Sequence, residues 1–476
     1  MPPASDTLDQ NATAGAASKD TPESAVTDSK ENAPAVAAPP GASAEVLNLL
    51  AKAQEEMGPD AAAKMLQMLS LQQQPKRRVC AESREAPKDK PHAFWDTQPV
   101  PKLAEEDLAA DGETGPLQEQ NVSDVRKTPL PLPESFEWYT VDIMDEADAD
   151  EVYTLLSQNY VEDDDSTFRF DYSREFLRWA TTPPHYRKHW HIACRVKATK
   201  KFVAFISGIP AKMQVCGKPV EVAEINFLCV HKKLRSKRMA PVLIKEVTRR
   251  VNLEGVWQAA YTAGVVLPKP VASCRYHHRN LNPKKLIECQ FSHLPQRMTM
   301  SRYIKLMALP GQHQLDGFRK MEERDIPQVQ KLLAEYLAKF KLYPCLDKSE
   351  VGHWILPRDK VIYAYVREQK QGKVTDVFSF YNLPSSVLGH EKHKTLNAAY
   401  SYLNVATTCT WPQLMTEALI QARLNDFDVF NALDVMDNSE FLTELKFGRG
   451  DGYLQYYLFN YRMPKLKSEE VGLVLL

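Results

Sequence analysis

The basic segment from Lys232 to Arg238, KKLRSKR, is the stretch of the sequence best suited to chemistry. An apolar run that ends at Val230 precedes it and predicts a buried strand, and the pattern from Pro241 to Leu253 predicts an amphipathic helix. Cationic side chains and the unpaired backbone N–H groups at the start of a helix both attract anions. The segment therefore predicts a site for a diphosphate group.

Known phosphate-binding motifs narrow this prediction. A Walker loop and a dinucleotide fingerprint both need glycines, which let the backbone approach phosphate, and this segment has none. Acyl-CoA N-acyltransferases use an Arg or Gln that opens a six-residue turn ending in Gly or Ala. The run from Arg235 to Ala240 is similar at both ends and departs at Arg238, where Gly is usual. A solvated basic face and a nucleic-acid patch remain as alternatives.

The last residues, VGLVLL, are apolar from Val471 to Leu476. Chain ends usually fray in water and tolerate polar residues. An aliphatic end therefore predicts a segment threaded into the core, which would carry the carboxylate of Leu476 with it. Cys229 is a candidate nucleophile, but on a buried strand without a basic neighbour in sequence it is more typical of inert packing.

Composition excludes several classes of protein. Lysine plus arginine (60) nearly balances aspartate plus glutamate (61), so no global field draws the molecule to nucleic acid or anionic lipid. The 8 cysteines show no paired spacing, which argues against a metal site or a disulfide framework. No export signal and no run of about 20 apolar residues is present. We expect a cytoplasmic protein without a transmembrane segment.

Four regions follow along the chain. Residues 1–43 are rich in Ala, Pro, Ser and acidic residues and predict a disordered tail. Residues 44–91 predict short helices and a basic linker, whose PKRR cluster is either solvated or attached to ribosomal RNA or another polyanion. The aromatics of HAFWDTQPVP, His92 to Pro101, predict a segment that covers a groove or a ligand. Two α+β units, 92–305 and 306–476, are predicted to follow.

The two units are inferred from an internal duplication. KFVAFISGIPAK is echoed by TDVFSFYNLPSS and VAEINFLCV by AAYSYLNVA, at a constant spacing that separates Trp179 from Trp354 by 175 positions. Each long strand is followed by a helix and another strand, so the central strands of the two copies are expected to meet near a pseudo-dyad. The second copy has TTCTWPQ where the first has its basic turn. One copy alone is therefore expected to bind a diphosphate.

Several segments together resemble the N-myristoyltransferases, the glycylpeptide N-tetradecanoyltransferases. They are HAFWDTQPVP, NYVEDDD, EINFLCVHKKLRSKR, YTAGVVLPKP, CRYHHR, NALDVMDN, KFGRGDG and the apolar C-terminus, in order from His92 to Leu476. The small departures are Met239 and His277. The resemblance implies a duplicated acyl-CoA N-acyltransferase fold with pseudo-twofold symmetry, whose first unit binds myristoyl-CoA as co-substrate and whose second forms much of a peptide groove.

The resemblance also implies the chemistry, which is transfer of a 14-carbon acyl group from a thioester to the amine of an N-terminal glycine. The backbone N–H groups of Phe227 and Leu228 would stabilise the tetrahedral oxyanion, and the Leu476 carboxylate would take the proton of the amine. No covalent nucleophile and no metal are implied. The residues implied to bind the acyl-CoA are His92, Ala93, Phe94, Trp95, Phe227, Leu228, Cys229, Val230, Arg235, Ser236, Lys237, Arg238, Met239 and Ala240.

The partner would be a peptide or protein that begins with glycine. The residues implied to bind it are Tyr160, Asp163, Asp164, Asp165, Phe168, Phe170, Tyr172, Asn226, Thr262, Tyr276, His278, Ser385, Tyr400 and Asp451. The acidic loop 163–165 is either a solvated turn or a site for Lys or Arg in the substrate. A nucleic-acid binder and an acyl-CoA carrier without catalysis are the competing classes, and the KFGRGDG and C-terminal segments argue against the carrier. We expect a monomer, with possible ribosome association through the N-terminal region.

Overall fold

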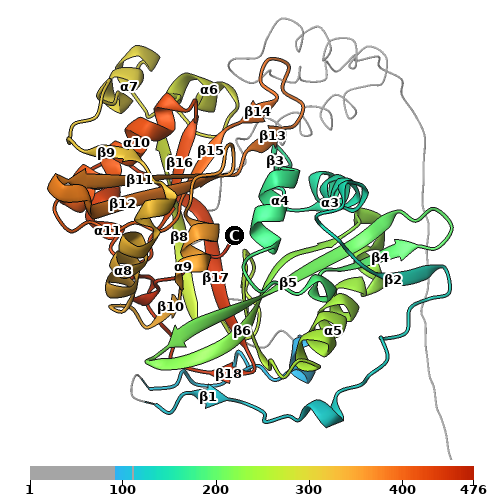
Figure 1. Ribbon diagram of the computed structural model, residues 1–476. Coiled ribbons are helices and arrows are strands. Elements are labelled where there is room, and N and C mark those ends of the chain that lie inside the picture. Colours follow the sequence, from blue (N-terminus) through green and yellow to red (C-terminus); the bar gives the residue numbers. More distant parts are fainter. Residues whose placement is uncertain (1–91, 110–111, 164) are drawn as a thin grey trace, which may run out of the picture. The chain divides into compact units, whose positions relative to one another are not determined.

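The computed structural model describes residues 92–109, 112–163 and 165–476. The predicted tail 1–43 and the predicted helices and linker of 44–91 lie outside the described residues, as does Asp164. The described chain is an α+β fold whose main sheet has 13 strands. In Figure 1 the colours of the first copy run from blue through green to yellow, and those of the second from yellow to red. The boundary between residues 305 and 306 stays a prediction.

The first copy holds the elements predicted for it, with helix and strand ends within a few residues of the expected ones. Its strands are β2 (Phe136–Thr140), β3 (Phe168–Phe170), β4 (Ile192–Val196), β5 (Phe202–Val215), β6 (Lys218–Val230), β7 (Gln258–Ala263) and β8 (Ala272–Asn280). Its helices are α3 (Glu146–Asn159), α4 (Arg174–Thr181), α5 (Met239–Asn252), α6 (Pro283–Glu288) and α7 (Met300–Met307).

The second copy repeats most of this order. Its strands are β9 (Phe318–Lys320), β10 (Leu342–Pro344), β11 (Ile362–Gln369), β12 (Lys373–Asn382), β13 (Ser385–Val387), β14 (Thr395–Leu396), β15 (Ala398–Ser401), β16 (Val429–Leu433) and β17 (Gly448–Phe459). Its helices are α8 (Ile326–Leu337), α9 (Lys348–Trp354), α10 (Trp411–Leu424) and α11 (Ser439–Leu442). A short ribbon of β1 (Gly115–Pro116) and β18 (Tyr461–Arg462) lies apart from the main sheet.

The strand order confirms the duplication. The sheet runs β2-β4-β5-β6-β7-β17-β8-β16-β15-β12-β11-β9, and this order reads the same from either end when β2 is matched with β9, β4 with β11 and so on inward. The β6–β7 and β15–β16 pairs are both parallel, and the pairs flanking them are antiparallel in both copies. The two copies are therefore related by a pseudo-twofold axis through the middle of the sheet.

The strands at this axis differ from the expected ones. The central strands β6 and β15 do not meet, because β17 and β8 lie between the copies and pair with each other. β17 is the last strand of the second copy but pairs with β7 of the first copy. β8 is the last strand of the first copy but pairs with β16 of the second. Each copy thus gives its last strand to the other, which the internal repeat could not reveal.

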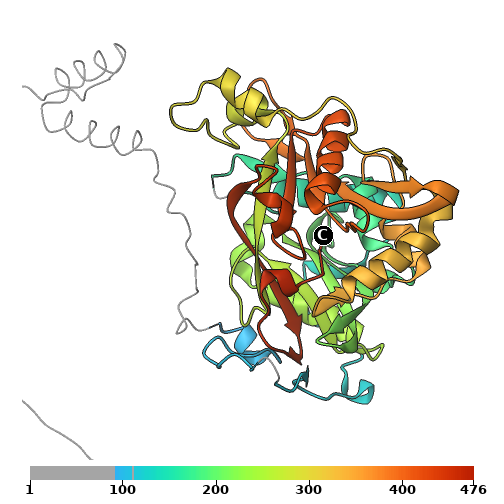
Figure 2. The same cartoon turned by 90° about the vertical axis from the view of Figure 1, so that its left-hand side faces the viewer.

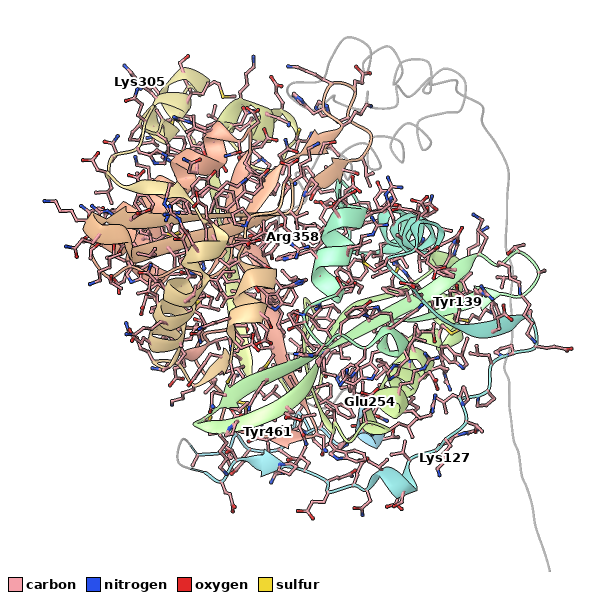
Figure 3. All side chains as sticks on the ribbon, in the orientation of Figure 1. Lys127, Tyr139, Glu254, Lys305, Arg358 and Tyr461 are labelled. Carbon is pink, nitrogen blue, oxygen red and sulfur yellow. The ribbon has the colours of Figure 1, made fainter. Side chains whose placement is uncertain are left out.

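Helices pack on both faces of the first copy's strands. Phe205 and Ile209 of β5 belong to the same buried cluster as α3, whereas Ala204 and Ile206 belong to the cluster that includes Leu243 of α5. Alternate residues of a strand point to opposite faces, so α3 and α5 cover opposite sides of the sheet. The side chains fill the space between the copies, and Figure 3 marks Arg358 at this junction, beside α4 and α9.

One face of α5 is not as solvated as its sequence suggests. Arg250 is buried, and its guanidinium binds the fully buried carboxylate of Glu246 at 2.9 Å, while Arg249 binds the same group at 2.7 Å. A buried carboxylate needs such partners to offset its desolvation. The face of α5 opposite its apolar stripe is therefore partly buried by ion pairs, at Arg249 as well as at Arg250.

Candidate functional site

A β-bulge interrupts the long strand β6 at the residues predicted to bind an oxyanion. Cys229 pairs with Phe205 and Asn226 with Ser207, so Phe227 and Leu228 together oppose one residue of β5. Phe227 has φ of 56°, a left-handed conformation that is uncommon for a bulky residue. A bulge leaves its extra residue outside the regular ladder. The Phe227 backbone N–H instead faces the buried hydroxyl of Tyr160.

A mostly apolar cavity of about 180 Å³ opens beside this bulge. The parallel pairing of β6 with β7 ends at Glu224 and Ala260, and the two strands separate beyond it. Helix α5 closes the gap with the side chains of Ile244, Val247 and Val251. The cavity is also lined by Trp95, Tyr160, Asn226, Phe227, Leu228, Tyr261, Thr262 and Leu476. Residues predicted for both ligands and for catalysis therefore share one space.

The C-terminal segment lies inside the fold, as its sequence predicted. The chain end lies amid the elements of both copies in two perpendicular views (Figures 1 and 2). Val471, Leu473 and Leu475 are buried, and the Tyr456 hydroxyl donates a hydrogen bond of 2.9 Å to the Leu473 carbonyl. The N–H of Gly472 donates to the Leu342 carbonyl at 2.8 Å. The backbone of this segment is thus fixed on both sides just before Leu476.

Leu476 separates the first cavity from a second, smaller one. The second cavity, of about 40 Å³, is lined by Leu476 and by residues of β5, β6, α9 and the chain after β15. Its polar side chains include Glu224 and Glu350. Burial raises the pKa of Glu224 to about 7, against the effect of its hydrogen bond from Asn226. A carboxylate in such surroundings is a frequent sign of a functional site.

The basic turn forms a 3-10 helix, η4 (Lys232–Lys237), followed directly by α5. Arg238 joins the two with φ of 58° and ψ of 30°, which explains why glycine would suit this position. No side chain caps the N-terminus of α5. In the second copy, Thr410 and Gln413 form a capping box that occupies the N-terminus of α10. Of these two equivalent helices, α5 thus offers uncapped N–H groups beside cations and α10 does not.

The cations of the turn divide into two groups. Lys232 binds Glu162 at 2.6 Å, and Arg235 donates to the Asn159 carbonyl at the end of α3. Within the described residues, Lys237 and Arg238 form no ion pair and are exposed. Only the backbone of Ser236 is described. Lys237 and Arg238 are therefore the cations best placed to meet an anion at the start of α5.

The predicted covering segment reaches the cavity through Trp95, in η1 (Trp95–Thr97). Its indole stacks on Tyr261, with ring centroids 5.8 Å apart, and Tyr261 stacks in turn on Tyr457 at 4.9 Å. Phe94 packs edge to face on Trp95 and lies 5.9 Å from the Lys245 ammonium. His92 and Ala93 precede these aromatics, and the Nε2 atom of His92 is buried without a hydrogen-bond partner among the described residues.

The residues predicted to bind peptide form one chain of aromatic contacts that starts at the bulge. Phe227 contacts Tyr172 at 5.2 Å, Tyr172 contacts Phe170 at 5.9 Å, and Phe170 contacts Tyr400 at 6.3 Å. Tyr400 then contacts Tyr276, which stacks on His278. Strand β3 carries Phe168 and Phe170 and pairs with β13, where Phe170 faces Ser385. Residues predicted to bind peptide therefore lie in one region, although they come from distant parts of the sequence and from both copies.

His278 is held in a fixed orientation within this region. Its Nδ1 atom lies 2.7 Å from the amide oxygen of Asn431, so Nδ1 carries the proton. Burial lowers the pKa of His278, which keeps the imidazole neutral at neutral pH. A Cβ on Gly450 would lie 2.5 Å from Nε2 of His278 and 2.8 Å from the Tyr276 carbonyl. The glycine-rich KFGRGDG segment, which also carries Asp451, thus packs directly on His278.

The acidic loop has a structural role in addition to any binding role. Both the Thr167 and Phe168 N–H groups donate to Asp163 at 2.7 Å, which fixes the turn that leads into β3. Asp163 and Asp165 are exposed. The solvated-turn interpretation therefore describes Asp163, whereas binding of basic residues by this loop stays a prediction.

Some residues predicted to bind the acyl-CoA lie away from the cavity. Cys229 is buried and its thiol points to the Leu155 carbonyl of α3. Burial raises the pKa of the Cys229 thiol to about 12, so the thiolate needed for nucleophilic attack is not formed at neutral pH. Val230, the last residue of β6, does not line the cavity either, nor do the buried Met239 and the half-buried Ala240 at the start of α5.

Several residues that line the two cavities are not predicted from the sequence. Tyr261 of β7 and Thr248 and Val251 of α5 are examples, because an apolar stripe does not reveal whether it faces a cavity. Glu224 could have been predicted from the sequence. It is a carboxylate between Ala223 and Ile225 in a strand predicted to be buried, and the cost of burying a charged group indicates a role for it.

Two general features of the described residues bear on function. None of the helices of the described part is both long and apolar enough to cross a bilayer. Across 92–476, apart from the gaps given above, there is no group of three or more His, Cys, Asp or Glu side chains arranged to hold a metal ion.

Comparisons with known proteins agree with the resemblance. Residues 116–274 match the N-terminal domain family of myristoyl-CoA:protein N-myristoyltransferase, and residues 288–474 match its C-terminal domain family. The chain is 54% identical over 410 residues to glycylpeptide N-tetradecanoyltransferase 2 of Bos taurus, covering 86% of this chain and 80% of that protein. It is 56% identical over 394 residues to glycylpeptide N-tetradecanoyltransferase 1 of Arabidopsis thaliana, covering 81% and 90%. The fold is similar to that of Saccharomyces cerevisiae N-myristoyltransferase with bound myristoyl-CoA, with a TM-score of 0.78 and 43% identity over 81% of this chain and 100% of that one.

Proposed function

Because the chain belongs to the myristoyl-CoA:protein N-myristoyltransferase family, we propose that it transfers a myristoyl group from myristoyl-CoA to the α-amino group of an N-terminal glycine. The observation that carries the proposal is the cavity beside the β6 bulge. It brings Phe227 and Leu228, which lie outside the strand ladder, together with the last residue of the chain, Leu476. Donors for an oxyanion and a carboxylate base thus border one apolar space.

The acyl-CoA would bind from the basic turn inward. Lys237 and Arg238, with the uncapped N–H groups of α5, would hold the diphosphate through charge-assisted hydrogen bonds. Trp95 would cover the pantetheine end of the cavity, and the apolar side chains of α5 and β6 would surround the acyl chain. The family relationship supports this order, and the apolar lining of the cavity fits an alkyl chain.

The reaction then needs no covalent intermediate. The glycine ammonium would give a proton to the Leu476 carboxylate, and the free amine would form a C–N bond to the thioester carbonyl carbon. The negative charge that develops on the oxygen would be stabilised by the N–H groups of Phe227 and Leu228. Collapse of the intermediate would break the C–S bond, and the proton lost by the nitrogen would leave with the CoA thiolate. The base and the donors would act beside a mostly apolar cavity, where electrostatic interactions are stronger than in water.

The peptide would follow the aromatic region that leads away from Phe227. Tyr160, Tyr172, Phe170, Tyr276, His278, Ser385 and Tyr400 belong to it, and Asn226 and Thr262 reach the cavity itself. The acidic residues Asp163, Asp165 and Asp451 would favour peptides with Lys or Arg near the glycine. Their exposure at the margin of this region supports a role in specificity rather than in the chemical step.

Mass spectrometry tests the proposal. A peptide that begins with glycine, incubated with the protein and myristoyl-CoA, should gain one myristoyl group on its α-nitrogen, whereas the same peptide beginning with alanine should not. Absence of the adduct with a folded protein that binds myristoyl-CoA would contradict the proposed activity.

A further inference from the structure

Glu224 occupies a position where a carboxylate has no obvious structural purpose. It lies on β6, two residues before Asn226, and its side chain lines the second cavity beside Leu476. The cavity walls around it include the apolar side chains of Ile209, Met213 and Leu473. Placing a carboxylate there costs desolvation energy. A different residue would be expected if packing were the only requirement.

The partner of Glu224 indicates what the carboxylate does. The Nδ2 group of Asn226 donates a hydrogen bond of 2.9 Å to Oε1 of Glu224, and within the described residues this is the hydrogen bond that Glu224 makes. The two residues stand at i and i+2 on one strand, so their side chains share a face. Asn226 is buried and also lines the first cavity, together with Thr262 and Leu476. Glu224 thus contacts the catalytic cavity through the amide of Asn226.

The charge state of Glu224 determines the orientation of this amide. An ionised carboxylate accepts hydrogen bonds and donates none, so it binds the nitrogen of the Asn226 amide and leaves the oxygen at the opposite corner. A protonated carboxyl group can donate, so it can bind either end of the amide. The glycine substrate brings N–H donors into the first cavity and needs acceptors there. An amide held with its oxygen available supplies one.

We propose that Glu224 is a positioning residue for the acyl transfer, and that its carboxylate holds the Asn226 amide so that the oxygen can accept a hydrogen bond from the glycine amine. This inference rests on the proposed function and adds a residue to it. Glu224 itself does not need to touch the substrate. Its effect passes through Asn226 and falls on the peptide, while myristoyl-CoA binding is left unchanged.

The surroundings of Glu224 make this positioning dependent on pH. Burial raises the pKa of Glu224 to about 7. The charged and titratable groups near it are Lys212 of β5 and Glu350 of α9, which line the same cavity, Tyr402 after β15 and Tyr456 of β17; Leu476, the last residue, also lines this cavity. Above this pKa the carboxylate fixes the amide, and below it the amide is free to turn. Peptide binding should therefore strengthen as the pH rises through this range.

Matched variants test the inference. E224Q keeps the shape of the side chain but offers both a donor and an acceptor, so the amide of Asn226 loses its preferred orientation. E350Q is the control, because Glu350 lines the same cavity, does not contact Asn226 and caps α9 in a box that glutamine also forms. The measurement is the Kd of a glycine-initiated peptide for protein preloaded with a non-transferring thioether analogue of myristoyl-CoA, so it does not depend on turnover.

E224Q should weaken peptide binding about tenfold at about pH 8, which is the effect of losing one charge-assisted hydrogen bond. The Kd of the thioether analogue should change less than about twofold. The ratio of wild-type to E224Q affinity should fall toward unity at about pH 5.5, and titration of the peptide amine cancels in this ratio. E350Q should match the wild type. In an N226A background, E224Q should cause no further loss.

Three results would overturn the inference. The first is equal peptide affinity of E224Q and the wild type. The second is a ratio of wild-type to E224Q peptide affinity that does not change with pH. The third is a loss of peptide affinity from E224Q that is the same in the N226A background as in the wild type. A wild-type protein that binds the peptide but forms no acyl adduct would instead contradict the proposed function, so the two failures can be told apart.

Discussion

Trp179 and Trp354 pack edge to face across the pseudo-dyad, with ring centroids 5.4 Å apart and ring planes at 76°. The internal repeat relates these two residues to each other, so the duplicated tryptophan of each copy contacts its own counterpart. Two hydrogen bonds also join the segments that carry these tryptophans, one in each direction. Trp179 Nε1 donates to the His353 carbonyl at 3.0 Å, and His353 Nε2 donates to the Trp179 carbonyl at 2.7 Å. The contact ties α4 to α9.

This contact makes the stability of the fold sensitive to acid. Burial lowers the pKa of His353 to about 4, below the value of about 6.5 expected in the unfolded chain. The unfolded state therefore binds the proton first as the pH falls, and the stability that the neutral imidazole contributes above pH 6.5 is lost progressively between about pH 6.5 and 4, by about 3 kcal/mol at most. His353→Gln should remove this part of the pH dependence in urea unfolding. The exposed His293, outside this contact, is changed to Gln as the control.

The affinity for the acyl-CoA should depend on acyl-chain length if the cavity beside the bulge is closed at its far end. Each buried methylene contributes about 0.8 kcal/mol, so a 12-carbon thioester should bind about 1.6 kcal/mol more weakly than the 14-carbon one, or roughly fifteenfold. A 16-carbon chain should bend or clash. Competition binding measures this directly, and equal affinity for all three chains would mean that the cavity is open at its far end.

Arg238 offers a way to separate charge from backbone strain. Arg238→Gly removes the cation but suits the left-handed conformation at this position. It should weaken acyl-CoA binding and reduce the dependence of that binding on salt, while the unfolding free energy is kept or rises by up to about 1 kcal/mol. Arg238→Lys should retain most of the binding. Lys331→Ala, on the exposed face of α8, serves as the distant control. If Arg238→Gly and the wild type bound acyl-CoA with equal affinity, Arg238 would not belong to the diphosphate site.

The two glycines around Asp451 form a natural pair for testing the peptide region. A Cβ on Gly450 would meet His278 and the Tyr276 carbonyl, whereas a Cβ on Gly452 would meet nothing within 4 Å. Gly450→Ala should therefore raise the peptide KM by about tenfold, the effect of losing about 1.4 kcal/mol of binding, with little change in acyl-CoA affinity. Gly452→Ala should behave as the wild type. Similar kinetics for both variants would place the peptide elsewhere.

The role of the C-terminal carboxylate can be tested by chemistry at a single atom. Protein ligation can replace the Leu476 carboxylate with a carboxamide, which keeps the buried segment but removes the base. The acyl-transfer rate in a single turnover should fall by at least about a hundredfold, within the usual range for a general base, while both substrates still bind. Removal of Leu475 and Leu476 together, or extension of the chain by a few residues, should also abolish turnover. A carboxamide protein with the normal rate would exclude Leu476 as the base.

The sequence was informative wherever local pattern and structure coincide. The strand that ends at Val230, the amphipathic α5 and the buried VGLVLL segment follow from hydrophobic spacing, and the constant repeat predicted the duplicated sheet. The resemblance supplied about a third of the residues that line the first cavity, among them Phe227, Leu228 and Leu476. What it could not supply was orientation. Cys229 and Leu228 are both apolar in sequence, but Cys229 belongs to the buried cluster that includes α3, whereas Leu228 packs against the cluster that includes Leu243 of α5.

The pairing of strands that are distant in sequence could not be predicted either. Nothing near β8 or β17 indicates that each would cross to the opposite copy, since both read as ordinary strands that follow a helix or a loop. The same limit applies to Glu224, whose acidity was visible but whose neighbours come from β5, α9 and the chain end. These relationships depend on tertiary contacts between distant segments, which spacing alone does not encode.

The exchange of β8 and β17 has a consequence for how the chain reaches its native state. The sheet of the first copy lacks its inner neighbour until residues 448–459 arrive, and these lie near the end of the chain. Neither copy can therefore complete its folding by itself. Contacts of such long sequence separation slow folding and leave an unpaired strand edge exposed during synthesis. We therefore expect the two copies to fold and unfold together as one cooperative unit.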